Sequence, residues 1–415
     1  MSVEKNELSR RDFLKTAAVC GAGSVLGAAG RRALGQSAPA SAPGEAAEGG
    51  AQPVPRRTFG KTGVDVAILT VGGIFDITAN QLVLKQALKW GIDYWDTAAS
   101  YTGGKSELGI GMFLQANPQE RKRIFLVTKA SDRDAAEMEQ SLNTSFERMK
   151  TDYVDMFFVH GVGSGDKVAR RAEDWKAMAE KLKAAKKIRF FGFSTHKNMA
   201  SCLDAAAKLG FIDGIMMAYN FRIMNSDEMK SAVEAASKAG IGLTAMKTQA
   251  KPSGGWDDEA TKLLDRFTQK GFSMEQAAVK AVWEDRRIAS LCSAMYKLNV
   301  LQSNYLAAID KVQLSSSDRE AMRRYARVSC SRYCAGCGDI CELAVAGGPP
   351  IADVMRFLMY RNEYGMVDLA RQLYRELPVA TREMLSRADY SLAERRCPQR
   401  MAIGELMRQA GSILA

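Results

Sequence analysis

The chain has 415 residues, of which 47% are hydrophobic and 25% are charged, a balance that excludes disordered and collagen-like proteins. Its formal net charge of +11 would suit an acidic partner. However, the Lys and Arg residues are spread over helical stretches such as 181–187 and form no basic stripe interleaved with aromatic residues, so nucleic-acid binding is not expected.

The N-terminal segment has the pattern of an export signal. Residues 9–15 are Ser-Arg-Arg-Asp-Phe-Leu-Lys, and a weakly apolar run of small residues follows to position 29. A paired arginine before such a run is typical of a signal for the twin-arginine translocase, which carries folded proteins. We therefore assign residues 1–36 to a signal peptide and the Ala-, Pro- and Gly-rich residues 37–55 to a flexible linker. We predict a periplasmic or otherwise exported protein without a stable membrane span after signal cleavage, because no apolar run approaches roughly 18 residues.

From Arg56 onward, apolar runs alternate with helical patterns. A hairpin is predicted at residues 58–66. Strands are predicted at 67–71, 94–96, 124–129, 154–160, 188–194, 215–218, 242–247 and 288–293. Helices are predicted at 79–90, 107–116, 135–149, 169–185, 198–209, 226–239 and 274–283. Because apolar strands need cover on both faces, and roughly eight strand–helix units fill roughly 250 residues, we predict an α/β fold, a (β/α)8 TIM barrel, over residues 56–312.

Polar side chains stand at or just after the ends of three predicted strands: Asp96, Tyr101, Lys129 and His160. The carboxyl ends of barrel strands meet at one mouth, so we expect these four side chains to form a catalytic site. There the Lys129 ammonium would lower the pKa of Tyr101, Asp96 would hold Lys129 in place, and His160 would position a carbonyl oxygen. A structural Lys–Asp pair and a core histidine are the alternatives for single members of the set.

Cysteines crowd in the region after the barrel, residues 313–415, which we predict to be a helical extension. Three closely spaced thiols and a distant fourth before a proline are how a ferredoxin-like [4Fe–4S] cluster is held. We predict one cluster, with Cys334, Cys337, Cys341 and Cys397 as ligands and Cys330 as a substitute. A zinc site, structural disulfides and a site that has lost its metal are the alternatives.

Two further expectations concern side chains that pack rather than react. The helical pattern over residues 351–376 has apolar positions at helical spacing, so we expect it to pack on the barrel rather than form an independent domain. Cys202 and Cys292 lie in apolar elements and are predicted to be inert core residues.

Several separated motifs give the chain a family resemblance. Trp95-Asp96-Thr97-Ala98, Tyr101 and Ser106-Glu107-Leu108-Gly109 are followed by Lys129, His160 and the strand Ile188–Ser194. In this order and spacing, from Arg56 to Asp310, the chain resembles the aldo/keto reductase family. The resemblance implies an NADPH-linked carbonyl reductase acting on a small-molecule carbonyl substrate, with Tyr101 as general acid. The cysteine-containing tail is similar to that of bacterial iron–sulfur aldo/keto reductases.

The resemblance also implies four cofactor-binding residues: Ser194, Met246, Gln302 and Asn304. Met246 stands where an aromatic residue usually stacks on the nicotinamide. Thr195 and His196 stand where an asparagine is usual, and Met216 where a glutamine is usual. The residues that usually grip the 2′-phosphate are replaced by Ala294, Met295 and Val300. The sequence therefore leaves NADP(H) and NAD(H) open.

These features predict an exported oxidoreductase that interconverts a carbonyl and an alcohol, coupled to one [4Fe–4S] cluster. The alternative is an electron-transfer or partner-binding protein that uses the barrel as a scaffold and meets a redox partner protein, without nicotinamide-dependent turnover. The altered nicotinamide contacts and the scarcity of free NADPH outside the cytoplasm motivate that alternative.

Overall fold

The computed structural model describes residues 51–131, 134–249 and 258–415. The predicted signal peptide and the predicted linker up to residue 50 lie outside this part of the chain. Across the three described ranges, no helix combines the length and the apolar character needed to span a membrane.

A short antiparallel hairpin closes the N-terminal end of the sheet, as the glycine-containing turn predicts. β1 (Arg56–Thr58) pairs with β2 (Asp65–Ala67) around the 3-10 turn η1 (Gly60–Thr62). The fully buried Phe59 contacts Phe125, with ring centroids 5.7 Å apart. A Cβ added at Gly242 would lie 2.4 Å from the Phe59 ring, so glycine is required where this ring packs on the first residue of β9.

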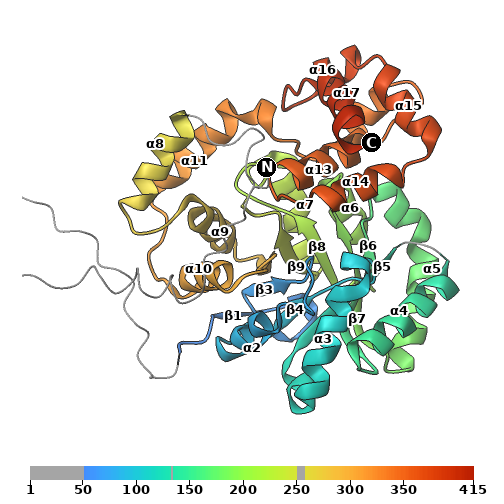
Figure 1. Ribbon diagram of the computed structural model, residues 1–415, viewed down its shortest axis with the longest axis vertical. Helices are drawn as coiled ribbons and strands as arrows, with labels where there is room; N and C mark the ends of the chain where they lie inside the picture. Colours follow the sequence, from blue (N-terminus) through green and yellow to red (C-terminus); the bar gives the residue numbers. More distant parts are fainter. Residues whose placement is uncertain (1–50, 132–133, 250–257) are drawn as a thin grey trace, which may run out of the picture. The chain divides into compact units, whose positions relative to one another are not determined.

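Eight parallel strands form a closed barrel, which confirms the predicted fold (Figure 1). Their order around the barrel is β10, β3, β4, β5, β6, β7, β8, β9. The strands are β3 (Leu69–Gly72), β4 (Tyr94–Asp96), β5 (Phe125–Ser131), β6 (Val154–His160), β7 (Ile188–Thr195), β8 (Gly214–Ala218), β9 (Gly242–Met246) and β10 (Ile288–Ser293).

Helices surround the barrel and cover the outer face of its strands (Figure 1). They are α2 (Gln81–Lys89), α3 (Lys105–Ala116), α4 (Ala135–Met149), α5 (Gly165–Ala184), α6 (Met199–Ala206), α7 (Asp227–Lys238), α8 (Asp258–Thr268), α9 (Met274–Glu284), α10 (Leu298–Ile309) and α11 (Ser316–Val328). Short 3-10 turns are η2 (Tyr101–Gly104) and η3 (Pro118–Arg123). The sequence patterns predict seven of these helices, but α8, α10 and α11 were not expected.

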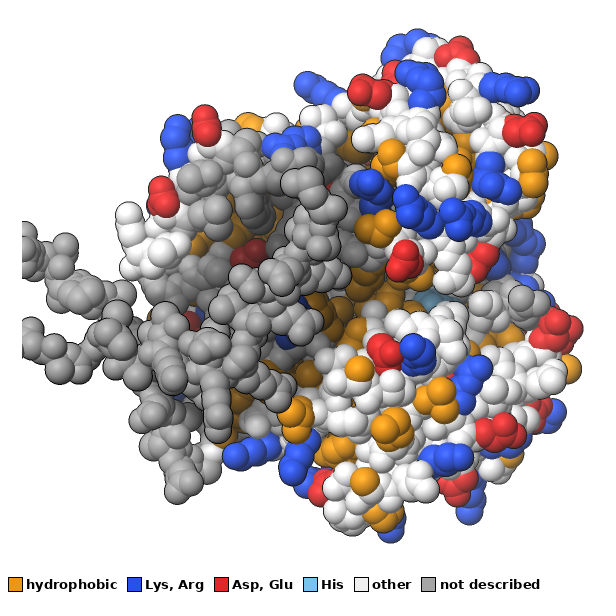
Figure 2. Space-filling model, viewed as in Figure 1, with side chains coloured by type: hydrophobic (Ala, Val, Ile, Leu, Met, Phe, Trp, Pro, Cys, Tyr) orange, Lys and Arg blue, Asp and Glu red, His pale blue; other side chains and the backbone are white. Residues whose placement is uncertain are grey.

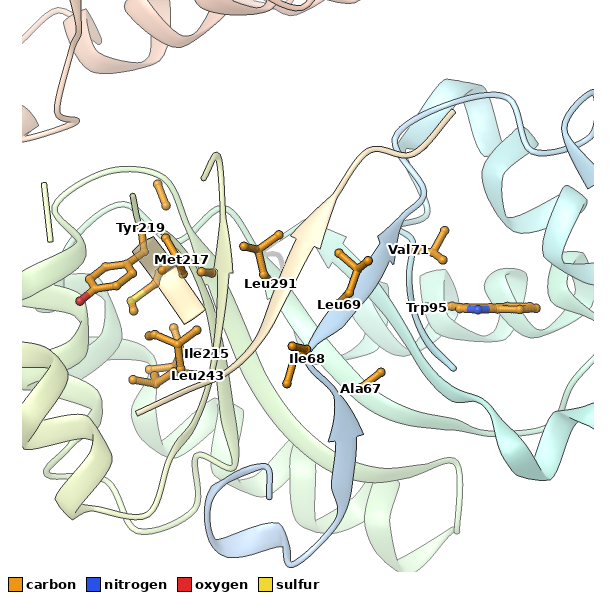
Figure 3. Close-up of a cluster of buried hydrophobic side chains, with 14 of the residues drawn as sticks. Ala67, Ile68, Leu69, Val71, Trp95, Ile215, Met217, Tyr219, Leu243 and Leu291 are labelled. Carbon is orange, nitrogen blue, oxygen red and sulfur yellow. The ribbon is translucent and has the colours of Figure 1, made fainter. Parts of the chain in front are cut away.

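Alternation along the strands divides the apolar side chains between two cores. Outward-facing residues such as Leu69, Val71 and Leu291 pack beneath the helices (Figure 3). Inward-facing residues such as Val127 and Met216 fill the barrel itself. Because side chains two residues apart share a face, the inward rows lead directly to the polar residues at the strand ends.

The C-terminal extension is helical, as predicted, and has an apolar core of its own. Its helices are α12 (Gly338–Cys341), α13 (Ile351–Asn362), α14 (Val367–Arg375), α15 (Val379–Arg387), α16 (Ser391–Arg396) and α17 (Ile403–Leu414), with turns η4 (Cys330–Arg332) and η5 (Glu342–Ala344). Gly365, at φ +67°, separates α13 from α14, so the single helical region predicted over 351–376 is two helices. Val354, Leu385 and Met407 belong to a buried cluster separate from the barrel core.

The extension docks on the loop between β7 and α6, next to the barrel (Figure 1). The backbone N–H of Asn198 donates to the Gly336 carbonyl at 2.8 Å, and the Asn198 side chain donates to Asp339 at 2.8 Å. Lys197 Nζ pairs with Asp353 of α13 at 2.9 Å. The extension therefore contacts the barrel as predicted, but through polar groups. The prediction that its apolar positions pack on the barrel was wrong, because those of α13 pack in the extension's own core.

Gly336→Ala should destabilise the protein more than Gly365→Ala. Both glycines have a positive φ, so either alanine costs about 1 kcal/mol in backbone strain. A Cβ at Gly336 would also lie 2.6 Å from the His196 carbonyl oxygen, whereas nothing lies within 4 Å at Gly365. We therefore expect a total cost of about 3 kcal/mol for Gly336→Ala, measured by chemical denaturation. Equal losses for the two variants would contradict this docking geometry.

Candidate active site

Strand alternation brings the four predicted catalytic side chains to one mouth of the barrel. Asp96 is two residues after the inward-facing Tyr94, and Lys129 is two residues after Val127. His160 follows Phe158 in the same way and ends β6. Strands β4, β5 and β6 are neighbours in the barrel, so the three side chains lie side by side.

A buried ion pair is at the centre of the site. Lys129 is 1% exposed and Asp96 is 2% exposed, and Lys129 Nζ lies 2.6 Å from Asp96 Oδ1. The same ammonium donates to the Thr97 carbonyl at 2.8 Å and to Tyr101 Oη at 3.4 Å. The rings of Tyr101 and His160 meet edge-on, with centroids 5.6 Å apart. The structure thus brings all four predicted residues together.

A buried glutamate holds the loop that carries Tyr101. Glu107, from the Ser-Glu-Leu-Gly motif, accepts a hydrogen bond from Thr128 at 2.6 Å, next to Lys129. It also pairs with Arg148 at 3.2 Å, and Arg148 donates to the Ala99 carbonyl at 3.0 Å. This network joins β5, α3 and α4 to the turn before Tyr101, so the motif positions the phenol.

The pKa of Tyr101 differs from the value expected from its ammonium neighbour. Burial raises this pKa well above 10, and the Asp96 charge raises it further. Because Asp96 neutralises much of the Lys129 charge, the expected lowering by Lys129 does not prevail. Tyr101 therefore holds its proton at neutral pH.

His160 is surrounded by cations. Burial and the charges of Lys129, Arg356 and Lys247 lower its pKa to about 3. The imidazole is consequently neutral at pH 7, with one ring nitrogen that donates and one that accepts hydrogen bonds. Of its three cationic neighbours, the sequence indicated only Lys129.

Cys292 was predicted to be an inert core residue, but it lies at the site. Its Sγ donates to Asp96 Oδ2 at 3.7 Å from near the end of β10. Burial raises the pKa of this thiol well above 9, so it stays protonated and satisfies the second oxygen of Asp96. Its place at a strand end, like that of the other polar residues, is the signal that could have revealed it. Cys202 is fully buried, as predicted.

The four predicted cofactor residues lie on the side of the mouth formed by β7 to β10. Ser194 Oγ, near the end of β7, accepts from Gly161 N–H at 3.1 Å, beside His160. Met246 ends β9 and is 8% exposed within the barrel core. On α10, Asn304 donates to Ser293 at 3.0 Å, and Gln302 is exposed. Ser194 lies in β7, Met246 ends β9, and Gln302 and Asn304 lie on α10, which follows β10.

Helix α13 of the extension adds side chains to this mouth that the sequence did not indicate. Arg356 donates to Tyr360 Oη at 3.4 Å and pairs with Asp353 at 2.9 Å. Lys247, which follows β9 with φ +58°, places its Nζ 4.4 Å from the Tyr360 ring centroid and 5.0 Å from that of Tyr364. Nothing in an amphipathic helix pattern distinguishes Arg356 and Tyr360 from surface residues, because their partners are distant in sequence.

Four cysteines line one apolar pocket in the extension. Cys334, Cys337, Cys341 and Cys397 are brought together there with Ile340, Ile351, Met355, Met401 and Ile403, and Cys330 is not part of the lining. In the described ranges all seven cysteines are free thiols, so no disulfide joins them. Nor does any described group of three or more His, Cys, Asp or Glu side chains have the arrangement of a site for a metal ion. Burial raises the pKa of Cys337 to about 11 and that of Cys341 to about 12.

This fold and this cluster of side chains define an enzyme of the (β/α)8-barrel class. A model of the aldo/keto reductase family matches residues 72–312, more than half of the 415 residues. The chain belongs to the aldo/keto reductase family and is an oxidoreductase. A model of the TAT (twin-arginine translocation) pathway signal sequence matches residues 7–27, so the chain carries a signal for export by that pathway.

Individual relatives are distant in sequence. L-galactose dehydrogenase of Arabidopsis thaliana is 22% identical over 298 residues, which are 64% of this chain and 91% of that protein. An aldo-keto reductase from Klebsiella pneumoniae in complex with NADPH is 20% identical, with a TM-score of 0.55 over 66% of this chain and 95% of that one. Aldo-keto reductase AKR11C1 from Bacillus halodurans, in its holo form, is 20% identical, with a TM-score of 0.54 over 65% and 96%. These structures share the fold.

Neither of the two histidines should titrate near neutral pH. Burial and nearby cations lower the pKa of His160 from 6.5 to about 3 and that of His196 well below 6.5. Their imidazole resonances in NMR spectra should therefore stay unchanged between pH 8 and pH 5. Since unfolded histidines take up protons near pH 6.5, folding stability should fall as the pH drops below that value. A titration midpoint near pH 6.5 for either imidazole would contradict the burial and the nearby cations that lower these pKa values.

Proposed function

We propose that this exported oxidoreductase interconverts a carbonyl and an alcohol, with Tyr101 as the general acid and base. The observation that carries the proposal is the contact of Lys129 Nζ with both Asp96, at 2.6 Å, and Tyr101 Oη, at 3.4 Å. In this arrangement the phenol that loses a proton stands beside an ammonium fixed by a buried carboxylate. The ammonium stabilises the phenolate that forms when the proton leaves.

The protonated state of Tyr101 suits the reductive direction. Because its pKa is raised by burial, Tyr101 carries the proton that the carbonyl oxygen needs as it becomes an alcohol. The neutral His160 donates a hydrogen bond to the same oxygen and orients it toward Tyr101. In the oxidative direction the proton returns from the alcohol to Tyr101.

A nicotinamide cofactor fits the side of the mouth formed by β7 to β10, and we propose that Ser194, Met246, Gln302 and Asn304 hold it. The thioether of Met246 offers an apolar contact for a ring face, and the exposed Gln302 is accessible to an adenosine moiety. When bound, the reduced nicotinamide supplies the hydride that the carbonyl carbon gains, and it is oxidised as the alcohol forms. NADP(H), which the Klebsiella relative contains, is the first choice for this chain.

Tyr101→Phe should abolish carbonyl reduction while leaving the fold intact. The variant keeps the ring but removes the proton donor, so kcat should fall by about a thousandfold. The assay follows NADPH or NADH oxidation with an aromatic aldehyde, and thermal unfolding reports the fold. Tyr296→Phe is the matched control, because Tyr296 is 44% exposed and should tolerate the change. Unchanged turnover in Tyr101→Phe would eliminate this mechanism.

A second function is favoured by one observation, the position of Lys247 beside Tyr360 and Tyr364 after β9. Lys247 directly follows Met246, which is proposed to hold the nicotinamide, so its contacts with Tyr360 and Tyr364 join that position to the extension. Such a connection is expected if the barrel is a scaffold and a redox partner protein exchanges electrons with the extension. Titration of the purified protein with NADPH and with NADH separates the two functions. Binding of neither would favour the electron-transfer protein.

We propose that Cys334, Cys337, Cys341 and Cys397 hold one [4Fe–4S] cluster. The support is that these four thiols line one apolar pocket and that Cys330 does not. When bound, the cluster would supply electron transfer, and its assembly would remove the protons that burial keeps on Cys334, Cys337 and Cys341 at neutral pH.

Cys337→Ser should remove the cluster, whereas Cys330→Ser should keep it. Protein purified anaerobically from the unmodified chain should show a broad visible absorbance band and contain about four iron and four sulfide ions per chain. Cys337→Ser should lose most of both, because it removes one of the four ligands. Colourless, iron-free protein, or equal iron contents in the two variants, would contradict the assignment.

A further inference from the structure

A cavity of about 610 Å³ lies between the barrel mouth and the extension. Pockets of this size take small-molecule ligands. Its walls include His196 and Lys247 from the barrel and Arg356 and Arg361 from α13. The four predicted catalytic residues are not part of this lining.

The charges around the cavity are predominantly positive. Lys247, Arg332, Arg356 and Arg361 line it, against the single carboxylate of Glu363. In Figure 2, Lys and Arg side chains gather along the part of the extension that borders a hollow toward the barrel. Low-dielectric walls that carry charge of one sign concentrate the field on the enclosed volume, which therefore favours an anion.

The pKa of the buried Tyr360 shows the effect of two of these cations. Burial alone would raise its pKa, but the charges of Lys247 and Arg356 outweigh burial and lower it to about 8. The two cations reach Tyr360 from different elements, since Lys247 Nζ is 4.4 Å from its ring centroid and Arg356 Nη1 is 3.4 Å from its Oη. A group that carries negative charge is thus stabilised at this place.

Two buried polar atoms of the lining residues make no hydrogen bond within the described part of the chain. They are His196 Nδ1 and Arg361 Nε. Buried polar groups without a partner are uncommon, and they are expected where a polar ligand or water completes the site. These two atoms come from different parts of the lining, one from the loop after β7 and one from α13.

The cations also act on the catalytic residues. Lys247 and Arg356 both contribute to the lowered pKa of His160, and the Arg356 charge opposes the rise in the pKa of Tyr101. His160 ends β6 and Lys247 directly follows the last residue of β9, so both residues stand at the same end of the parallel barrel. A compound whose carbonyl oxygen contacts Tyr101 and His160 can therefore extend an anionic group toward Lys247 and Arg356.

We propose that this cavity binds the carboxylate of an anionic carbonyl substrate, an oxo acid or an aldehyde acid, with Lys247 and Arg356 as its cationic partners. The inference rests on the proposed function, because it places the reacting carbonyl at Tyr101. It assigns to the extension a share of substrate recognition, since α13 supplies Arg356. Both residues bind the non-reacting end of the substrate and take no part in proton transfer.

The test compares an anionic aldehyde with its neutral analogue. Binding of 4-carboxybenzaldehyde and of 4-carbamoylbenzaldehyde to the full chain is measured by titration calorimetry, without turnover. The carboxylate should bind at least about tenfold more tightly than the amide, and Lys247→Met and Arg356→Met should each reduce this preference about tenfold. Lys238→Met is the matched control, because Lys238 is exposed on α7 and should leave the preference unchanged.

Arg356→Lys guards against loss of fold, since it keeps the charge beside Asp353 and should retain most of the preference. Tyr101→Phe separates this inference from the proposed function, because it should lose turnover but keep the preference for the carboxylate. Turnover retained in Tyr101→Phe would overturn the mechanism alone. Equal binding of the two aldehydes, or a preference unchanged in both Lys247→Met and Arg356→Met, would overturn the anion site.

Discussion

The buried ion pair between Lys129 and Asp96 is the interaction on which the site depends. Both side chains are almost fully enclosed, and burial by itself raises the pKa of Asp96, so the Lys129 ammonium is needed to stabilise the charged carboxylate there. The pair is held by the ends of β4 and β5, and Cys292 completes the hydrogen bonding of Asp96 from β10. Loss of one member would leave a buried charge unpaired, at a cost of about 3–5 kcal/mol. The barrel strands therefore stabilise the pair that orients Tyr101.

Local patterns were enough to predict the barrel and the four polar residues that meet at its mouth. The positions of Asp96, Lys129 and His160 follow from strand periodicity and from the convergence of strand ends, which are properties of the sequence within a few residues. The capping box formed by Ser315 and Asp318, visible in the sequence, would also have predicted the start of α11. Neither inference requires knowledge of distant contacts.

The remaining features depend on contacts between distant segments, which a single sequence does not encode in any local pattern. Arg356 and Tyr360 meet the barrel mouth only because α13 docks on the loop that follows β7. The direction of the Tyr101 pKa shift also depends on how deeply the phenol is buried and on the charge of Asp96, which outweigh a nearby ammonium. Cys397 was the exception, because its position beside distant cysteines was predicted from the sequence. A cysteine before a proline, distant from three closely spaced cysteines, is a known pattern of iron–sulfur ligands.

Docking of the extension also gives a physical reason for the departures from the usual cofactor contacts after β7. In this loop Lys197 pairs with Glu342 and Asp353, and Asn198 bonds to Gly336 and Asp339. The backbone of His196 meets Gly336 so closely that no Cβ fits there. The same segment therefore cannot be optimised for a nicotinamide amide alone, since it also holds the loop that carries the cysteines. The residues after Ser194 therefore serve the docking of the extension on the barrel.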